Sequence, residues 1–99
     1  MALTLKFPEK FYWGTATSAY QVEGGIRNNW SALGGKFDAG IACDHYHRFE
    51  EDFDLAKEGG HNAHRFSIEW SRIEPEEGKF NLKEIEHYRK VISALRVRN

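Results

Sequence analysis

The sequence predicts an α/β fold, the first two βα units of a (β/α)8 TIM barrel, on the basis of three observations. Segments with strand and helix character alternate in the order strand, helix, strand, helix along the 99 residues. The connections from strand to helix take roughly 25 and roughly 12 residues, whereas the usual connection takes about 2–6. A spacing of roughly 50 residues per unit, carried through eight units, gives a barrel of about 400 residues.

The first strand is predicted over Phe11–Thr17, because this run is aromatic and β-branched and follows Pro8. We expect this strand to be buried. From Ser18 to about Ala42 the apolar periodicity disappears, and glycine and asparagine are frequent. This composition predicts a long loop between the first strand and the first helix.

The first helix is predicted to start at Asp44, a residue type that caps helices, and to run to about Glu58. Its apolar residues have the spacing of one helical face: Tyr46, Phe49, Phe53 and Ala56. The pair Gly59-Gly60 ends the helix, because glycine adopts the left-handed conformation without strain.

The second strand is predicted over His61–Ile68, and a loop follows over Glu69–Phe80. Asn81, with Glu84 three residues later, resembles a capping box and predicts the start of a second helix. The apolar stripe of that helix is Ile85, Tyr88, Ile92 and Leu95. Residues 1–99 are therefore expected to hold strand 1, helix 1, strand 2 and helix 2 of a partial catalytic domain.

The long connections leave the C-terminal ends of the two strands. Ligands bind at that edge in parallel α/β proteins, so we expect any site of this chain to lie there. Two parallel strands with helices on one side leave both sheet edges open and one sheet face uncovered. The expected partner of this incomplete barrel is therefore the rest of the barrel.

Composition excludes several classes of partner. Fourteen Lys and Arg against fifteen Asp and Glu leave a net charge of −1, which gives no basis for nucleic acid or an anionic membrane as partner. No apolar run approaches the ~20 residues of a membrane span. The single Cys43 cannot form an internal disulfide, and the first residues lack the apolar core of a signal peptide, so we expect a cytoplasmic protein.

Three blocks of sequence resemble a known family. Residues 11–25, Phe-Tyr-Trp-Gly-Thr-Ala-Thr-Ser-Ala-Tyr-Gln-Val-Glu-Gly-Gly, are similar to the N-terminal signature of glycoside hydrolase family 1, the β-glucosidases and β-galactosidases. Residues 44–52 resemble the first helix of that family and residues 65–73 its second strand. The resemblance covers nearly the whole chain, which corresponds to an N-terminal piece of about a quarter of a (β/α)8 barrel.

The resemblance implies an enzyme that hydrolyses β-D-glycosidic bonds at the non-reducing end of a β-glycoside or oligosaccharide, with retention and without a cofactor. Such enzymes use two carboxyl groups ~5–5.5 Å apart, one as nucleophile and one as general acid and base. In the family these glutamates follow strands four and seven, beyond Asn99. We therefore expect no catalytic carboxylate in this chain and no activity of the chain alone.

Several carboxylates of the chain nevertheless lie near the predicted site. Glu69 leaves the second strand at the catalytic edge, but the family gives that position no catalytic role, so a surface or supporting role is expected. For Glu23 we expect a structural pairing with an arginine or with backbone amides. The remaining group is predicted to form the solvated face of the first helix: Glu50, Glu51, Asp52 and Asp54.

Two residues are candidates for a functional role at the site. Gln21 carries a neutral amide that can bind two adjacent sugar hydroxyls, and the resemblance implies that it binds the non-reducing sugar. The alternative for Gln21 is an amide that only organises the loop. Arg65 matches the family's arginine beneath the nucleophile, which keeps that carboxylate ionised and oriented. The alternative for Arg65 is an internal structural ion pair.

Histidines and tryptophans suggest two further kinds of site. The spacing of His45, His47, His61 and His64 does not form a recognised set of metal ligands, so packing and hydrogen bonding are expected and no metal is predicted. Trp13 and Trp70 are predicted to lie in the barrel core. Trp30 is the one tryptophan expected as an exposed platform for a sugar ring.

A second class of function stays open, namely a non-catalytic module that binds sugar or associates with itself through the strand edge and the aromatic residues. The reading frame after Asn99 separates the two classes. A third strand followed later by an Asn-Glu-Pro-like segment favours the enzyme, and a natural stop favours the module.

Overall fold

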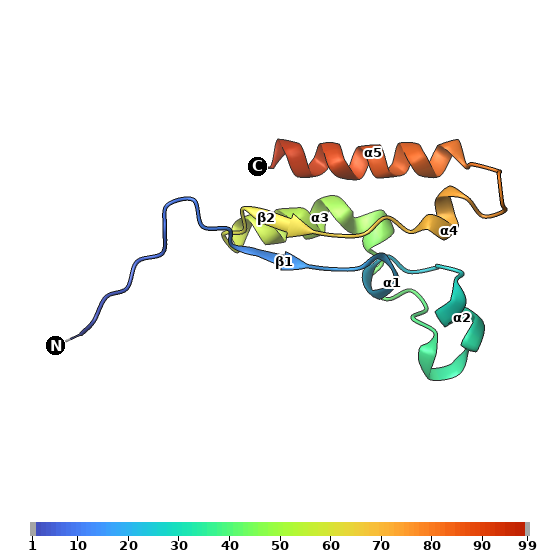
Figure 1. The fold of residues 1–99 in the computed structure, drawn as a ribbon, viewed down its shortest axis with the longest axis horizontal. Helices are drawn as coiled ribbons and strands as arrows, with labels where there is room; N and C mark the ends of the chain where they lie inside the picture. The colour runs from blue at the N-terminus through green and yellow to red at the C-terminus, as the bar shows by residue number, and fades with distance from the viewer. Residues whose placement is uncertain (1, 99) are drawn as a thin grey trace.

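Two parallel strands and two long helices form the frame of the chain, in the expected order (Figure 1). The computed structural model describes residues 2–98. The frame consists of β1 (Gly14–Ala16), α3 (His45–Glu58), β2 (Ala63–Arg65) and α5 (Leu82–Val97). Both long helices lie on one side of the two strands, and this arrangement is that of two consecutive βα units.

The strands are shorter and more exposed than the sequence predicts. Gly14 pairs with Ala63, and the register continues to the pair of Ala16 and Arg65. A side chain at Gly14 would collide with the Ala63 carbonyl, so glycine is required by the close approach of the strands. All three residues of β1 are exposed, which contradicts the expected burial, because within residues 2–98 β2 is the only strand beside β1.

The segment from residue 18 to residue 42 is more ordered than the predicted loop. It contains α1 (Ala19–Val22), α2 (Asn29–Leu33) and the 3-10 helix η1 (Gly35–Phe37). The Asn28 side chain caps α2 by accepting the Ser31 N–H at 3.1 Å, and the Ser31 hydroxyl accepts the Asn28 N–H at 2.8 Å. Such short helices are held by local hydrogen bonds, so they leave no apolar periodicity for a sequence reading to detect.

Helix α3 has the predicted bounds but a different start. Asp44 occupies the N-cap position in the left-handed conformation, with φ 52°, and its side chain does not cap the helix. The carboxylate instead lies 2.7 Å from Nδ1 of His47, so the predicted capping chemistry is wrong. The helix ends at Glu58, and Gly60 then takes φ +85°, a conformation that favours glycine as expected.

Helix α5 starts as predicted and buries a slightly rotated face. The Asn81 side chain accepts the Lys83 N–H at 3.0 Å, whereas the Glu84 carboxylate binds the Tyr46 hydroxyl instead of completing a capping box. Ile92, predicted in the apolar stripe, is 39% exposed, and Val91 is buried. The face is rotated because α5 packs against both α3 and α4 (Trp70–Ile73).

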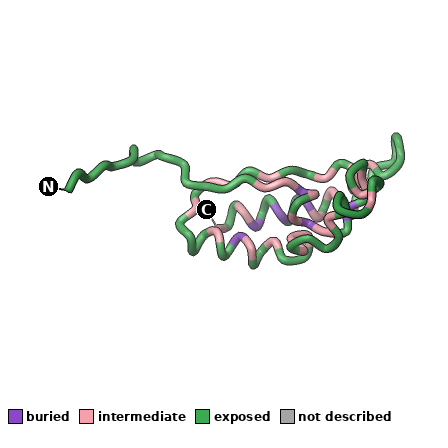
Figure 2. Tube along the Cα trace, turned by 90° about the horizontal axis from the view of Figure 1, so that it is seen from below, coloured by how far each residue is buried: buried purple, intermediate pink, exposed green. Residues whose placement is uncertain are grey.

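The core lies where α3, α4 and α5 pack together on the helix side of β2. Figure 2 shows most of the buried residues in this layer, while both strands are exposed or half-buried along their length. The buried cluster consists of Phe53, Ile73, Tyr88, Val91 and Ala94, with Phe49, Phe66, Ile85 and Leu95 packed against it. The two βα units therefore form one shared buried cluster between their helices.

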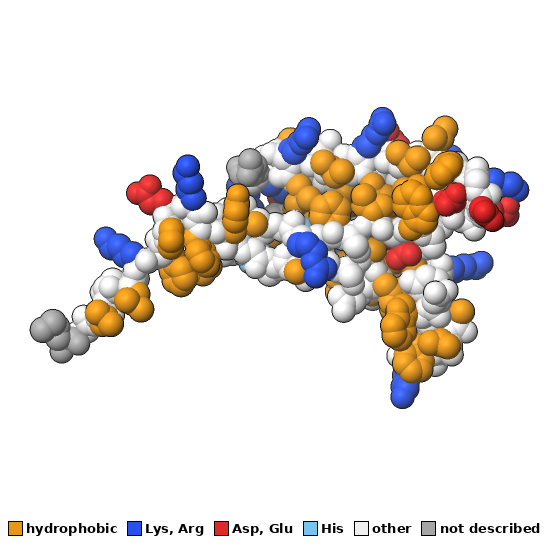
Figure 3. Space-filling model, viewed as in Figure 1, with side chains coloured by type: hydrophobic (Ala, Val, Ile, Leu, Met, Phe, Trp, Pro, Cys, Tyr) orange, Lys and Arg blue, Asp and Glu red, His pale blue; other side chains and the backbone are white. Residues whose placement is uncertain are grey.

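Outside this core the chain is not compact. Its radius of gyration is 16.9 Å, whereas a compact domain of 100 residues has about 13 Å. Figure 3 shows hydrophobic side chains on the surface along the N-terminal segment, below α5 and over α2. Trp13 and Trp70, predicted in the barrel core, are 47% and 59% exposed here, and Trp30 is 55% exposed. None of the helices within residues 2–98 has the length and apolar character that a membrane crossing requires.

Candidate functional site

The C-terminal edge of the sheet carries the first candidate residue, Gln21. Helix α1 begins directly after β1, and the Ala19 N–H at its start donates to Oγ of Ser67, just beyond β2, at 2.7 Å. Gln21 lies in this one-turn helix with an exposed side chain. The structure therefore places Gln21 at the edge where the sequence predicts a site, with its amide open to solvent.

Arg65, the second candidate, lies at the same edge on the open side of the sheet. His64 packs its ring 5.5 Å from that of Phe53 on the helix side, and side chains alternate along a strand. Arg65 therefore points to the opposite face, where it is exposed and donates from Nη1 to the Thr17 carbonyl at 2.8 Å. None of the ion pairs within residues 2–98 includes Arg65, so the internal pair considered as its alternative role is not present there.

Glu23 is buried at the same edge and holds an arginine, as predicted. Its side chain accepts from Nε of Arg72 at 3.0 Å, and the Tyr88 hydroxyl lies 2.9 Å from both carboxylate oxygens. Burial raises the pKa of Glu23 above its ordinary value, although Tyr88 and Arg72 both favour the charged form. We call Glu23, Arg72 and Tyr88 the edge network.

Arg72 is the centre of this network. Its Nη2 donates to the Gly24 carbonyl at 2.7 Å, and its guanidinium lies 4.2 Å from the centre of the Tyr46 ring. The Tyr46 hydroxyl donates to Glu84 at 2.7 Å, and burial together with this carboxylate raises the pKa of Tyr46 to about 12.

The sequence reading missed most of these contacts. It assigned Tyr46 and Tyr88 to apolar stripes and gave Arg72 no role. One feature of the sequence did point to these contacts: two residues of the apolar stripes are tyrosines. A buried tyrosine hydroxyl needs a hydrogen-bond partner, so a polar contact could have been predicted at each.

The carboxylates at this edge are not arranged as a nucleophile and an acid. Both oxygens of Glu23 are bound in the edge network. Glu69 is half-buried and accepts from the Ser71 hydroxyl at 2.9 Å, while its backbone N–H donates to the Tyr88 hydroxyl. A retaining pair needs two carboxyl groups that both face the scissile bond. These two glutamates support the structure around the edge instead.

The carboxylates of α3 form a solvated face only in part. Glu50 is exposed, and Glu51 pairs with Arg48 at 3.1 Å on the surface, as expected. Asp52 is half-buried and lies 2.7 Å from Nδ1 of His45. Asp54 is exposed and pairs with Arg98 at 2.6 Å, and this arginine lowers its pKa. The sequence pattern did not reveal the partners of Asp52 and Asp54.

Three of the four histidines singled out by the sequence take the expected packing or hydrogen-bonding positions, whereas Nδ1 of His61 is buried without a partner among residues 2–98. His45 and His47 each contact an aspartate, and His64 lies between the rings of Phe53 and Phe66. Burial lowers the pKa of His64, with His45 contributing in the same direction. Across residues 2–98 no three or more His, Cys, Asp or Glu side chains come together in an arrangement for a metal ion.

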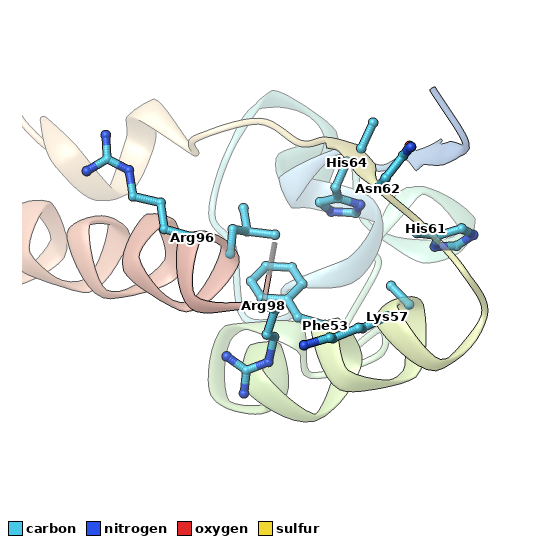
Figure 4. A pocket seen from close by; sticks show the side chains of 10 residues that line it. Phe53, Lys57, His61, Asn62, His64, Arg96 and Arg98 are labelled. Atoms are coloured by element: carbon cyan, nitrogen blue, oxygen red, sulfur yellow. The ribbon is translucent and has the colours of Figure 1, made fainter. Parts of the chain in front are cut away.

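A cavity of about 270 Å³ opens at the other end of the strands (Figure 4). Its walls come from the start of β2 and the ends of α3 and α5, and they include Lys57 and His61. Arg98 at its rim is bound to Asp54 and to the Ala94 carbonyl, and in Figure 4 Arg96 extends away from the histidines. This cavity is separate from the C-terminal edge that carries Gln21.

The chain matches one family of known proteins. The family model described as Glycosyl hydrolase family 1 matches residues 3–99. Beta-glucosidase A of Acetivibrio thermocellus is 42% identical over 105 residues, which cover 92% of this chain and 23% of that protein. Beta-glucosidase 6 of Oryza sativa subsp. japonica is 44% identical over 103 residues, which cover 90% of this chain and 20% of that protein.

A solved structure agrees with these relatives. The beta-glycosidase from Pyrococcus horikoshii superposes with a TM-score of 0.88 at 46% identity, and the match covers 97% of this chain and 24% of that chain. The open two-unit arrangement is therefore the arrangement that the same segment has within a larger relative. The chain spans about a quarter of the length of the relatives it matches.

Proposed function

The chain belongs to glycosyl hydrolase family 1, and on that premise we propose that it forms the first quarter of a retaining β-glycosidase built as a (β/α)8 barrel. The whole enzyme would hydrolyse β-D-glycosidic bonds at the non-reducing end of its substrate. One observation carries this proposal: Gln21 and Arg65 leave consecutive parallel strands at the same C-terminal edge. In barrels of this kind that edge holds the active site.

The role we propose for Gln21 is binding of the non-reducing sugar. Its exposed amide offers both donors and an acceptor, so it can hold two neighbouring hydroxyls without adding charge. The short helix that carries it starts at the strand edge, where the Ser67 hydroxyl fixes its first N–H. A ligand at the edge can therefore reach the amide directly.

The role we propose for Arg65 is to orient the nucleophile and keep it ionised. The guanidinium is exposed on the face of the sheet that the helices leave open, and the Thr17 carbonyl occupies only one of its donors. A carboxylate brought against this face by a later strand would gain a charge-assisted hydrogen bond, which lowers its pKa.

The chemistry itself would require the rest of the barrel. Both carboxyl groups of the retaining mechanism would come from later strands, one attacking the anomeric carbon while the other protonates the leaving oxygen. The open sheet face and the exposed apolar side chains beside it, such as Ile68, are the surface that the remaining units would cover. No cofactor enters this mechanism.

The test compares this chain alone with a completed barrel, defined as residues 1–99 in place of the matching first quarter of the Pyrococcus horikoshii beta-glycosidase. We expect the completed barrel to hydrolyse an aryl-β-glucoside and the chain alone to show no turnover above buffer. A folded but inactive completed barrel would overturn the proposal. Turnover by the purified chain that disappears in Glu69→Gln would instead give Glu69 a catalytic role.

One observation favours the non-catalytic alternative. Trp30 of α2 is 55% exposed, and the centre of its ring lies 6.1 Å from that of Phe37 in η1. The two rings together form a small aromatic surface. Calorimetric titration of the chain alone with cellobiose tests this alternative. Binding lost in Trp30→Ala but kept in Gln21→Ala would favour a sugar-binding module over the enzyme.

A further inference from the structure

We propose that the edge network of Glu23, Arg72 and Tyr88 positions Gln21 for the sugar, so that these three residues influence glycoside specificity without touching substrate. This inference rests on the proposed role of Gln21. It assigns a function to the one buried charged side chain among residues 2–98.

Helix α1 cannot hold Gln21 in place by itself. It has four residues, and an isolated helix of that length is unstable because its hydrogen bonds do not offset the cost of nucleation. Its position must therefore come from contacts at its two ends. At the start, the Ala19 N–H is held by Ser67 at 2.7 Å.

The end of α1 is held by the edge network. Glu23 lies two residues after Gln21 and closes the helix with a hydrogen bond from its N–H to the Ala19 carbonyl at 2.8 Å. Its carboxylate is bound by Arg72 of α4 and Tyr88 of α5. Arg72 also binds the next carbonyl, that of Gly24, so it holds both the side chain and the backbone at this point.

The Glu23–Arg72 ion pair is better suited to positioning α1 than to raising the free energy of unfolding. An ion pair buried to this degree gains little over well-packed apolar side chains, because both charges lose their water. The planar Arg72 guanidinium holds its donors in a fixed geometry, so it fixes the distance and orientation of the groups that it binds. The bonds of Glu23 span 49 residues to Arg72 and 65 to Tyr88, so they set α1 against the second βα unit.

The test is a double-mutant cycle in the completed barrel, with Glu23→Gln and Gln21→Ala alone and together. We expect Glu23→Gln to lower kcat/KM for the aryl-β-glucoside about 10- to 100-fold, the range for a small misplacement of a binding group. In the Gln21→Ala background the same change should have little further effect, because the group being positioned is already absent.

Two further variants separate positioning from loss of structure. Tyr88→Phe removes the hydroxyl that donates to Glu23 and accepts the Glu69 N–H and leaves the ring in place, so it tests the proposal even if Glu23→Gln fails to fold. Glu84→Gln is the matched control for Glu23→Gln. It replaces a carboxylate by an amide in the same way, but at a residue of α5 that binds Tyr46 and not the edge network. We expect Tyr88→Phe to change the ratio of glucoside to galactoside hydrolysis as Gln21→Ala does, and Glu84→Gln to leave that ratio unchanged.

The outcomes distinguish this inference from the proposed function. If Gln21→Ala leaves kcat/KM and sugar preference unchanged, the proposed role of Gln21 fails and the inference fails with it. If Gln21→Ala has its effect but Glu23→Gln and Tyr88→Phe act additively with it, or leave sugar preference unchanged while lowering Tm, only the positioning inference is overturned.

Discussion

The two sides of the sheet differ in how complete their contacts are. On the helix side, Phe53 and Tyr88 are 4% exposed and pack within a closed cluster. On the other side, β1 is exposed along its length and Arg65 of β2 is exposed as well. The contacts within and between the two βα units are therefore made, while the contacts that a barrel makes between distant units are absent from residues 2–98.

Polar groups near the strands are only partly satisfied. At the C-terminal edge, the edge network gives both carboxylate oxygens of Glu23 a partner. Three other buried atoms lack partners among residues 2–98, namely Oγ1 of Thr17 just beyond β1, Nδ1 of His61 before β2 and Nε2 of His64 within β2. Unpartnered buried polar atoms are uncommon in complete domains, so these three atoms agree with an incomplete barrel.

The largest expected effect tests the closed side. Phe53→Ala removes the ring at the centre of the buried cluster, and large-to-small changes of this kind cost about 3–5 kcal/mol. Leu55→Ala, in the same helix but 60% exposed, should stay within about 0.5 kcal/mol. Hydrogen exchange of the α3 and α5 amides in the completed barrel measures both effects. Equal loss of protection in the two variants would contradict a closed helix side.

The second prediction tests the open side. With both sheet edges and one sheet face uncovered, the chain alone should be a self-associated or molten species, larger in sedimentation than 11.5 kDa. Ile68, just beyond β2, is 46% exposed, so burying the rest of its side chain contributes about half of the 1.5–3 kcal/mol of a full burial, and Ile68→Asn should weaken association about 3- to 10-fold.

Leu33→Asn is the matched control for Ile68→Asn. Leu33 is more exposed, at 65%, but it lies in α2, away from the sheet. If Leu33→Asn weakens association as much as Ile68→Asn does, or if the chain sediments as a monomer with a cooperative melt, the chain does not associate through the region of the sheet.

The third prediction compares the two proposed site residues in the completed barrel. Gln21→Ala should lower kcat/KM by one to two powers of ten, since an unmade buried hydrogen bond costs about 1–3 kcal/mol, and it should alter sugar preference. Arg65→Gln should raise the pKa of the nucleophile and move the acidic limb of the pH–rate profile to higher pH, because less nucleophile is ionised at a given pH.

Measuring kcat/KM against pH for a glucoside and a galactoside separates these two roles. Gln21→Ala is expected to leave the profile in place, and Arg65→Gln to leave sugar preference in place. Equal shifts of the profile in both variants, or unchanged sugar choice in both, would show that the roles implied by family resemblance do not apply to these residues.

The sequence could predict the elements whose pattern is local and periodic. Helix α3 ends at Glu58 as expected, since a glycine pair and a one-sided apolar stripe both act within a few residues. The edge network could not be predicted in detail, because its partners are 49 and 65 residues apart and nothing local marks them. The exposure of β1 also differed from expectation, because burial depends on neighbours that residues 2–98 do not include.

The smallest expected effect is a pH dependence confined to the closed side. His87 stacks on Tyr46 with the ring centres 3.8 Å apart, and burial lowers the pKa of His87 below its ordinary value of 6.5, while Glu84 opposes this shift. The folded chain therefore binds this proton less tightly than the unfolded chain. Stability from His87 is fully present above pH 6.5 and is lost as pH falls below that value toward the folded pKa.

The burial of Glu23 acts in the opposite direction. Its raised pKa means that the folded chain binds the carboxyl proton more tightly, so stability from Glu23 increases as pH falls toward the ordinary value of 4.5. His64 acts with His87, because burial lowers its pKa as well. A loss of stability that begins near pH 6.5 on acidification therefore has to come from the histidines.

Hydrogen exchange between pH 7 and pH 5.5, corrected for the intrinsic rate at each pH, measures this effect. Protection in the first half of α5 should fall between these two pH values, and His87→Phe should reduce the fall because it keeps an aromatic ring and removes the titrating group. His47→Phe removes an imidazole that is 73% exposed and contributes less than burial does to the lowered pKa of His87, so it should reduce the fall less than His87→Phe does. If His47→Phe reduces the fall and His87→Phe does not, the dependence comes from the solvent-facing surface.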